Sequence, residues 1–302
     1  MLPFARVTIL GLGLIGSSIA RGIRQHMPSV RVTGYDADPA VRETAVAIDL
    51  CDDVADSAGT SVIDADLVIL CVPVGAMGAV AAELAADLPA EAIVSDVGSS
   101  KLSVIDAVRE ALPSATFIPA HPVAGTENSG PTAGFASLFH HRWCIVTPPE
   151  GSDPLAVERV SEFWRRLGAN VEMMEPGHHD RVLAVTSHLP HLIAYTIVGT
   201  ASDLEEVTQS EVIKYSAGGF RDFTRIAASD PTMWRDVFLN NREAVLDMLQ
   251  RFTEDLTALQ RAIRWGKGDE LFELFSRTRA IRRSIIDQGQ DDARPDFGRS
   301  HE

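Results

Sequence analysis

Residues 7–23 read VTILGLGLIGSSIARGI and join a β-branched run to a glycine-rich turn and a helical pattern. Gly11, Gly13 and Gly16 have G-x-G-x-x-G spacing directly after the predicted strand and at the start of the predicted helix. The first glycine permits a tight turn, the second lets the backbone approach a pyrophosphate, and the third lets helix and strand pack closely. The stretch therefore predicts a dinucleotide-binding unit that opens an α/β domain.

The second predicted strand ends in GYDADP, which places Asp36 twenty residues past Gly16. A carboxylate there accepts hydrogen bonds from both ribose hydroxyls and repels a 2′-phosphate, so the sequence favours NAD over NADP. A later strand ends in CVPVG (71–75), where we expect chain to pass beneath the bound dinucleotide. The predicted NAD contacts are Gly11, Leu12, Gly13, Leu14, Ile15, Gly16, Asp36, Val72, Pro73 and Gly98.

Strand-like and helical runs alternate through the first half of the chain. Strands are predicted over 6–10, 31–36, 66–72, 92–97, 116–120 and 143–148. This alternation predicts parallel strands in a doubly wound α/β sheet. After residue 176 the strand pattern stops, and helices are predicted over 179–201, 203–217, 231–265 and 267–287. We predict an NAD-binding Rossmann domain over 1–176, an all-α C-terminal domain for substrate and dimerisation over 177–288, and a disordered tail over 289–302.

The predicted helix over 231–265 carries a long apolar stripe. Its members are Phe238, Val245, Leu249, Phe252, Leu256, Leu259 and Ile263. Residues that recur at sevens, fours and threes lie on one face of a helix. Such a face is either the centre of a helical core or the seam of a dimer, and the sequence leaves both interpretations open.

Composition limits the classes of partner. The 302 residues are 45% apolar and 23% charged, and the formal net charge is −15. A strongly acidic chain binds nucleic acid and anionic membranes poorly, whereas a local basic pocket for a small anionic metabolite is compatible with it. The cysteines share no spacing motif, the start lacks a signal-peptide pattern, and no run of about 18 unbroken apolar residues occurs. We expect a cytoplasmic protein with neither nucleic-acid nor membrane partners.

The stretch AHPVAGTENSG (120–130) ends a predicted strand on His121, and Ser99 follows another predicted strand in the loop SDVGSSK (95–101). Ligands of doubly wound sheets bind beyond the carboxyl ends of the strands, so both side chains should face the nicotinamide. An imidazole with a pKa of about 6.5 can take a proton from an alcohol as hydride leaves its carbon. The alternative is that His121 is a strand-end residue bonded to backbone.

Five blocks carry a resemblance to a known family. GLGLIGSS, SDVGSSK, HPVAGTENSG, SHLPHLIAY and GGFRDFTRIAASDPTMWRD occur in this order. From about residue 6 to 287 the chain is similar to the prephenate/arogenate (cyclohexadienyl) dehydrogenases of tyrosine biosynthesis. The resemblance implies oxidation at ring C4 of an anionic cyclohexadiene acid, with NAD as hydride acceptor and loss of the C1 carboxylate as CO2. It also implies a homodimer built from the helical half.

The same resemblance implies roles for single residues. It makes His121 the acceptor of the ring hydroxyl's hydrogen bond, with Ser99 beside it as a second catalytic residue. Arg225 would hold a substrate carboxylate, and His191 would contact the substrate side chain. Thr126 and Glu127 are substrate-binding candidates on the resemblance alone. Trp234, in DPTMWRD, is either a core anchor or a lid over the substrate.

Other interpretations remain open from the residues alone. The chain resembles in outline a β-hydroxyacid dehydrogenase or an imine reductase, in which a helical lysine serves as acid or base and Lys214 is the candidate. A non-catalytic NAD-sensing protein is a further alternative. The histidines at 178, 179, 188 and 191 lack a completing ligand motif, so we predict no metal site. The choice between prephenate and arogenate, and feedback by tyrosine, stay open.

Overall fold

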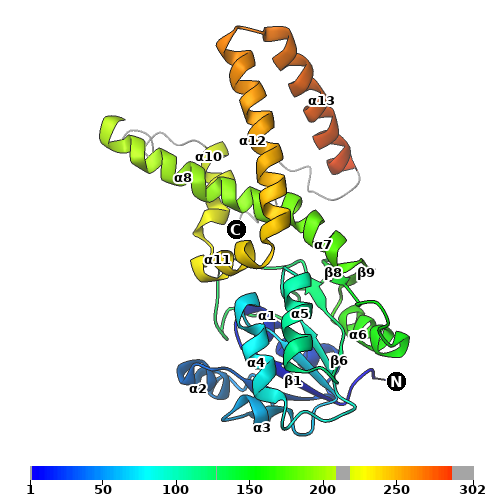
Figure 1. Ribbon diagram of the computed structural model, residues 1–302. Coiled ribbons are helices and arrows are strands. Elements are labelled where there is room, and N and C mark those ends of the chain that lie inside the picture. Colours follow the sequence, from blue (N-terminus) through cyan, green and yellow to red (C-terminus); the bar gives the residue numbers. More distant parts are fainter. Residues whose placement is uncertain (1, 127, 209–217, 288–302) are drawn as a thin grey trace. The chain divides into compact units, whose positions relative to one another are not determined.

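The computed structural model describes residues 2–126, 128–208 and 218–287 (Figure 1). The chain divides into two compact units, Met1–Leu246 and Asp247–Glu302. The larger unit contains both sheets and the first helices of the predicted helical half. The domain boundary that the sequence places at residue 176 stays a prediction, and the predicted tail lies outside the described residues.

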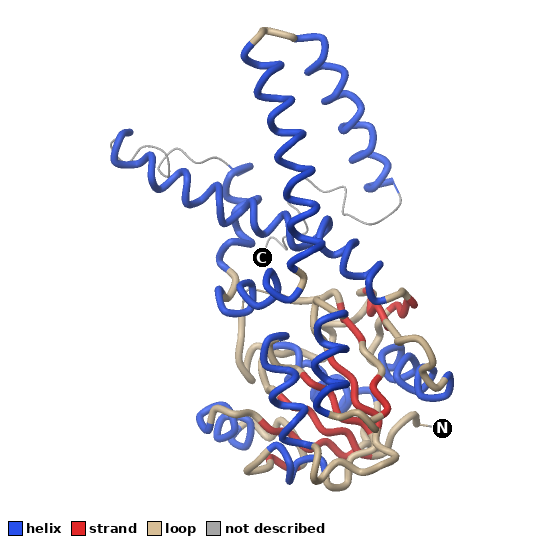
Figure 2. Tube along the Cα trace, viewed as in Figure 1, coloured by secondary structure: helices blue, strands red, loops and turns tan. Residues whose placement is uncertain are grey.

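Six parallel strands form the main sheet in the order β3-β2-β1-β4-β5-β6. Figure 2 shows the strands in red with helices in blue around them. They are β1 (Arg6–Leu10), β2 (Arg31–Tyr35), β3 (Asp53–Val54), β4 (Leu67–Leu70), β5 (Ile93–Asp96) and β6 (Thr116–Phe117). The helices of this part are α1 (Leu14–His26), α2 (Pro39–Ala47), α3 (Ala58–Val62), α4 (Met77–Leu84), α5 (Leu102–Ala111) and α6 (Pro154–Arg166). The parallel pairing confirms the predicted doubly wound fold.

Successive side chains of β1 pack into two separate cores on opposite faces of the sheet. Ile9 packs in a cluster with side chains of α1 and α6, whereas Leu10 packs in a cluster with side chains of α4 and α5. This is the alternation that a strand covered on both faces requires. Trp234 and Val237 of α11 (Pro231–Asn240) belong to the second cluster, so α11 is anchored to the nucleotide-binding half.

A small second sheet departs from the prediction. The strand expected over 116–120 is divided into β6 and β7 (Ala120–Pro122), and β7 pairs antiparallel with β8 (Trp143–Val146), which also pairs with β9 (Asn170–Met173). Pro119 stands at the division and has no N–H to continue the ladder along β5. The chain therefore leaves the main sheet at Pro119 and carries His121 into the second sheet.

The first helical run is longer than predicted. It consists of α7 (Pro176–Leu183), the π turn η2 (Ala184–His188) and α8 (Leu189–Thr208), without the break expected near residue 202. Residues 209–217, which include Lys214, lie outside the described residues. The part Pro176–Asp203 is long and apolar enough to cross a membrane by length and composition, but core helices of soluble proteins have the same character.

The prediction of a single helix over 231–265 is wrong. The structure has α11 and then α12 (Arg242–Arg264), with Asn241 between them in a non-helical conformation (φ −114°, ψ 33°). The buried Asn241 side chain donates from Nδ2 to the Asp180 carbonyl oxygen at 2.8 Å and lies 3.1 Å from His188 Nδ1. The hydrogen bond from Asn241 to α7 therefore lies at a break in a helix that the apolar spacing predicts to be continuous.

Apolar side chains remain exposed on α12 and on α13 (Gly268–Asp287). They are Leu246, Leu256 and Ile263 on α12, Trp265 directly after it, and Phe272, Phe275 and Ile281 on α13, each at least 47% exposed. Exposed apolar side chains gathered on neighbouring helices are typical of an interaction surface. Of the predicted stripe, Val245 is buried and Phe238 packs against the second core cluster, whereas Leu256 and Ile263 belong to this exposed set. The stripe thus serves the core at its start and is exposed toward its end.

Candidate functional site

The glycine loop between β1 and α1 is shaped to leave space for a ligand. Gly11 has φ +97°, and a Cβ on it would lie 2.5 Å from the Cys71 carbonyl oxygen, while a Cβ on Gly16 would collide with the Gly11 carbonyl oxygen. A Cβ on Gly13 would meet nothing within 4 Å. No side chain caps α1, and no acidic residue lies in its first turn. The loop and the helix N-terminus thus fit a pyrophosphate.

Asp36 is fixed beside this loop. Its Oδ2 accepts a hydrogen bond from the Leu12 N–H at 2.8 Å, and its Oδ1 accepts one from the Asp38 N–H at 3.0 Å. The carboxylate follows β2, which is paired directly with β1. Its position at the carboxyl end of the strand suits an acceptor for ribose hydroxyls.

The other predicted NAD contacts lie on adjoining strand ends. Leu14 and Ile15 begin α1, Val72 and Pro73 follow β4, and Gly98 follows β5. Because β1, β2, β4 and β5 are neighbours in the sheet, these segments share its carboxyl edge. The residues that the sequence assigns to the dinucleotide therefore lie on one edge, although their contacts with a cofactor stay a prediction.

His121 lies on β7 and is 7% exposed. Its Nδ1 lies 2.9 Å from Nε2 of His179 on α7. Burial lowers the pKa of His121 well below the ordinary histidine value, and the neighbouring His179 and Lys101 add to the effect. The imidazole is therefore neutral at physiological pH and has the protonation state that a proton acceptor needs.

Sequence reasoning missed a buried ion pair behind this histidine. Lys101 Nζ lies 2.6 Å from Asp96 Oδ2, and both side chains are fully buried. Lys101 Nζ also donates to the Ala120 carbonyl oxygen at 2.7 Å, while Asp96 accepts from the Ala120 N–H and the Gly98 N–H. The pair holds the start of β7 against the end of β5. The signal was present in SDVGSSK, which contains two opposite charges beside a buried strand.

A second missed group lies on the helical side. His179 Nδ1 is 2.9 Å from Asp180 Oδ1, and the Asp180 carboxylate accepts hydrogen bonds from the N–H groups of Lys101 and Leu102 at the start of α5. Burial lowers the pKa of His188, which Asn241 contacts, to about 4. The cluster GHHD (177–180) was weighed only as a metal site, although a histidine next to an aspartate is also a common hydrogen-bonded pair.

Ser99 lies between Gly98 and this network, in the loop that leads from β5 to α5. Its backbone faces His188 and raises the pKa of that imidazole, against the larger effect of burial. Ser99 is thus next to the buried polar cluster, a contact that the sequence did not predict. Its proposed contact with the substrate hydroxyl remains a prediction.

His191, Trp234 and Arg225 come together on the helical side. The rings of His191 and Trp234 stack with centroids 3.7 Å apart and an interplanar angle of 23°. Burial lowers the pKa of His191, the Ser187 carbonyl opposes this, and the nearby positive charge of Arg225 lowers it further. Arg225 is exposed in the short helix η3 (Arg225–Ala228). Trp234 is therefore both a core residue and the stacking partner of His191.

The loop after His121 carries the last two candidates. Thr126 is exposed, and its Oγ1 accepts a hydrogen bond from the Asn128 N–H at 3.2 Å. Glu127 lies outside the described residues. Within the described ranges, no group of three or more His, Cys, Asp or Glu side chains is arranged to hold a metal ion.

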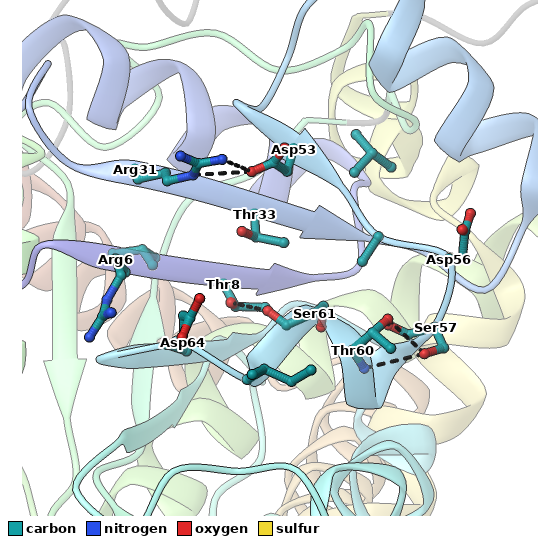
Figure 3. Close-up of a pocket in the computed structure, with 15 residues that line it drawn as sticks. Arg6, Thr8, Arg31, Thr33, Asp53, Asp56, Ser57, Thr60, Ser61 and Asp64 are labelled. Atoms are coloured by element: carbon teal, nitrogen blue, oxygen red, sulfur yellow. Dashed lines mark hydrogen bonds and ion pairs between the residues drawn. The ribbon is translucent and has the colours of Figure 1, made fainter.

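A hollow of about 680 Å³ lies elsewhere, along the amino-terminal parts of β1, β2 and β3 (Figure 3). Its polar side chains are engaged with one another: Arg31 pairs with Asp53, and Thr8 donates to the Ser61 carbonyl oxygen (Figure 3). Doubly wound sheets bind their ligands at the opposite, carboxyl ends of the strands. We therefore assign the functional site to the carboxyl edge, which carries the glycine loop and to which the start of β7, just before His121, is hydrogen-bonded through Asp96.

Comparison with known proteins shows which family the chain is similar to. Residues 19–173 match the model of the prephenate dehydrogenase nucleotide-binding domain, and residues 175–277 match that of the prephenate dehydrogenase dimerization domain. The cyclohexadienyl dehydrogenase of Zymomonas mobilis is 45% identical over 285 residues, 94% of this chain and 97% of that protein. The prephenate dehydrogenase of Bacillus subtilis is 34% identical over 278 residues, 91% of this chain and 75% of that protein.

A solved structure agrees over the same length. Prephenate dehydrogenase from A. aeolicus, in complex with hydroxyphenyl propionate and NAD+, superposes with a TM-score of 0.87 at 34% identity. The superposition covers 94% of this chain and 98% of that one. The likeness therefore includes both the nucleotide-binding half and the helical half.

Proposed function

The chain belongs to the prephenate dehydrogenase family, and we propose that it catalyses the NAD-dependent oxidative decarboxylation of prephenate, arogenate or both. Prephenate would give 4-hydroxyphenylpyruvate, and arogenate would give tyrosine. The observation that carries the proposal within the structure is His121, a buried neutral imidazole directly after Ala120, which is hydrogen-bonded to Asp96 at the carboxyl end of β5. A binding protein without catalysis has no need of a proton acceptor at that place.

The glycine loop and Asp36 would hold NAD, which supplies the acceptor for the hydride that leaves ring C4. His121 Nε2 accepts the proton of the C4 hydroxyl, and Ser99 positions that hydroxyl. Because the imidazole is buried and neutral, water does not compete for its lone pair. The carbonyl formed at C4 is conjugated with the ring, so the C1 carboxylate can leave as CO2 and the ring becomes aromatic.

The substrate is an anion with two ends to hold. Arg225 presents a planar guanidinium that matches the C1 carboxylate, and its proximity to His191 supports a joint role. His191 Nδ1 faces the Ser187 carbonyl oxygen at 2.9 Å, so Nδ1 carries the hydrogen and Nε2 is left as an acceptor. Trp234 holds that ring in place by stacking, and Thr126 and Glu127 remain rim candidates.

We also propose a cytoplasmic homodimer. The dimerization-domain match covers α8, α11, α12 and the first half of α13, and the exposed apolar side chains of α12 and α13 supply a surface that a second copy would bury. The family assignment replaces the hydroxyacid dehydrogenase and imine reductase interpretations. An NAD-sensing protein is distinguished from the enzyme by the assay that follows.

The test is the near-ultraviolet absorbance of reduced nicotinamide, measured with purified protein, prephenate or arogenate, and NAD or NADP. Reduced cofactor formed with NAD and either substrate is expected, with slower turnover on NADP because Asp36 repels the extra phosphate. Tight NAD binding with no turnover of either acid would overturn the proposal and favour a sensor.

A further inference from the structure

Two histidines and an aspartate form a continuous hydrogen-bonded chain inside the protein. Asp180 contacts His179, and His179 contacts His121, each at 2.9 Å. All three side chains are buried, and they come from two different segments, β7 and α7. Only His121 is assigned a part in the reaction above, so the chain behind it needs an explanation.

The hydrogen positions follow from the aspartate outwards. An ionised carboxylate only accepts hydrogen bonds, and Asp180 already accepts those of Lys101 and Leu102, so His179 Nδ1 must carry a hydrogen. The other nitrogen of neutral His179, Nε2, is then an acceptor and takes the hydrogen bond of His121 Nδ1–H. His121 Nε2 is left with a lone pair. The chain thus fixes His121 in the tautomer that can accept a proton.

We propose that His179 stores the substrate's proton during turnover: as His121 Nε2 takes the proton of the ring hydroxyl, the proton on His121 Nδ1 moves to His179 Nε2. The inference rests on the proposed function, since it concerns the same reaction. His179 becomes an imidazolium next to Asp180, and His121 stays neutral. In the terms of the reaction, His121 is catalytic, and His179 and Asp180 are positioning residues that act through it.

The groups around the two rings favour this location of the charge. A positive charge on His121 would lie in a fully buried site near Lys101 and His188, while the same charge on His179 would lie beside Asp180. Burial and Lys101 also lower the pKa of His179, but Asp180 and Asp96 oppose them there, whereas the groups that act on His121 all disfavour a positive charge. Opposite charges in contact within a protein interior attract strongly, and like charges repel with comparable strength. The second histidine is therefore the better place for the proton.

The protons balance over one turnover. The hydride leaves C4 for NAD, the hydroxyl proton goes to His121 Nε2, and the C4–O bond becomes a carbonyl. When CO2 leaves, its bonding electrons pass through the ring to that oxygen. The oxygen then takes the proton back from His121 Nε2, and His179 returns its proton to His121 Nδ1. No proton has to reach the solvent, which suits a chain that is buried throughout.

Replacement of His179 separates storage from orientation. In His179→Gln the amide oxygen can still accept the His121 Nδ1–H, but it cannot hold a proton at neutral pH. His179→Leu removes both abilities, and His178→Gln changes the exposed neighbour as a control. We expect kcat to fall about 10- to 100-fold in both His179 variants, while KM changes less than about threefold. The control should keep wild-type kinetics.

The outcomes discriminate between the ideas. If His179→Gln keeps kcat within about threefold of wild type while His179→Leu loses activity, the second histidine only orients the first and the storage proposal is wrong. If the wild type itself turns over neither acid, the proposed function fails first. A thermal unfolding curve for each variant shows whether a lost activity is a lost fold.

Nitrogen NMR of the histidine rings tests the hydrogen positions without any substrate. We expect both His121 and His179 to carry their hydrogen on Nδ1 in the free enzyme near neutral pH, and His179→Gln to leave the His121 signal in that tautomer. A His121 ring with its hydrogen on Nε2 would overturn the proposal, whatever the activity of the protein.

Discussion

Lys101→Met is the most direct test of how the site is held together. The substitution keeps the buried stem and removes the ammonium group that lies 2.6 Å from Asp96 and 2.7 Å from the Ala120 carbonyl oxygen. A carboxylate with no exposed surface would then lack its partner. Removal of one member of a buried pair typically lowers the free energy of unfolding by about 3–5 kcal/mol. For a chain of this size that corresponds to a Tm lower by about 6–20 °C.

The matched control is Arg165→Met. Arg165 also pairs with a carboxylate at 2.8 Å, that of Glu158, but the two side chains are 44% and 64% exposed. An exposed pair contributes at most about 1 kcal/mol, so its loss should barely change Tm. Urea and thermal unfolding of the two variants and the wild type measure the difference. Equal losses in Lys101→Met and Arg165→Met would refute the claim that burial makes the Asp96 pair important.

The same variant has a pH signature. Burial already raises the pKa of Asp96 in the wild type, and without Lys101 this effect has less opposition. A carboxyl whose folded pKa is above its unfolded value stabilises the fold at low pH and loses that contribution as pH rises. Lys101→Met should therefore be closest to wild-type stability in mild acid and furthest from it above neutral pH. The opposite trend would mean that Asp96 is not the group left uncompensated.

Three further outcomes are expected. His121→Asn should mainly lower kcat. Arg225→Ala should mainly raise KM, because the carboxylate that the arginine holds loses its charge as CO2 departs. Steady-state kinetics with these two effects exchanged would disprove the roles. The value of kcat/KM should rise with pH, because His121 accepts a proton only when it is neutral. The midpoint of this rise should lie below about 6.5, because burial lowers the pKa of His121. A midpoint above that value would contradict the burial argument. Asp36→Ser should raise kcat/KM with NADP relative to NAD, because the repulsion of the 2′-phosphate is removed; an unchanged cofactor ratio would show that Asp36 does not set the preference.

The elements that sequence predicted well are those governed by local rules. The glycine spacing, the alternation of strands and helices and the Asp36 position depend on backbone shape and on side-chain period, which a single sequence records. Trp234 was left between two roles, and the structure shows why, because the ring belongs to the second core cluster and also stacks on His191.

What the sequence did not reveal depends on contacts between distant segments. The bond from Asn241 to the Asp180 carbonyl joins residues 61 positions apart, and it breaks a helix whose apolar spacing is continuous. Lys101 and Asp96 read as ordinary loop charges until the chain folds over them. His179 could be found only with His121 in view, and those residues lie 58 positions apart.

The π turn Ala184–His188 has a consequence for how the helical run tolerates change in length. It joins the segment that carries His179 to the segment that carries His191, within one helical run. A π turn accommodates a residue more than the α-helical repeat, and each residue of an α-helix rotates the chain by about 100°. Deleting one residue between 184 and 187 would remove this extra residue and restore a regular helix, with His191 facing nearly the same way relative to His179. A deletion in the α-helical part just before His191 would instead turn that side chain by about 100°. The half of the site that handles the proton and the half that binds the substrate thus share a rotational register, and the π turn is a place where the run can lose one residue and keep that register.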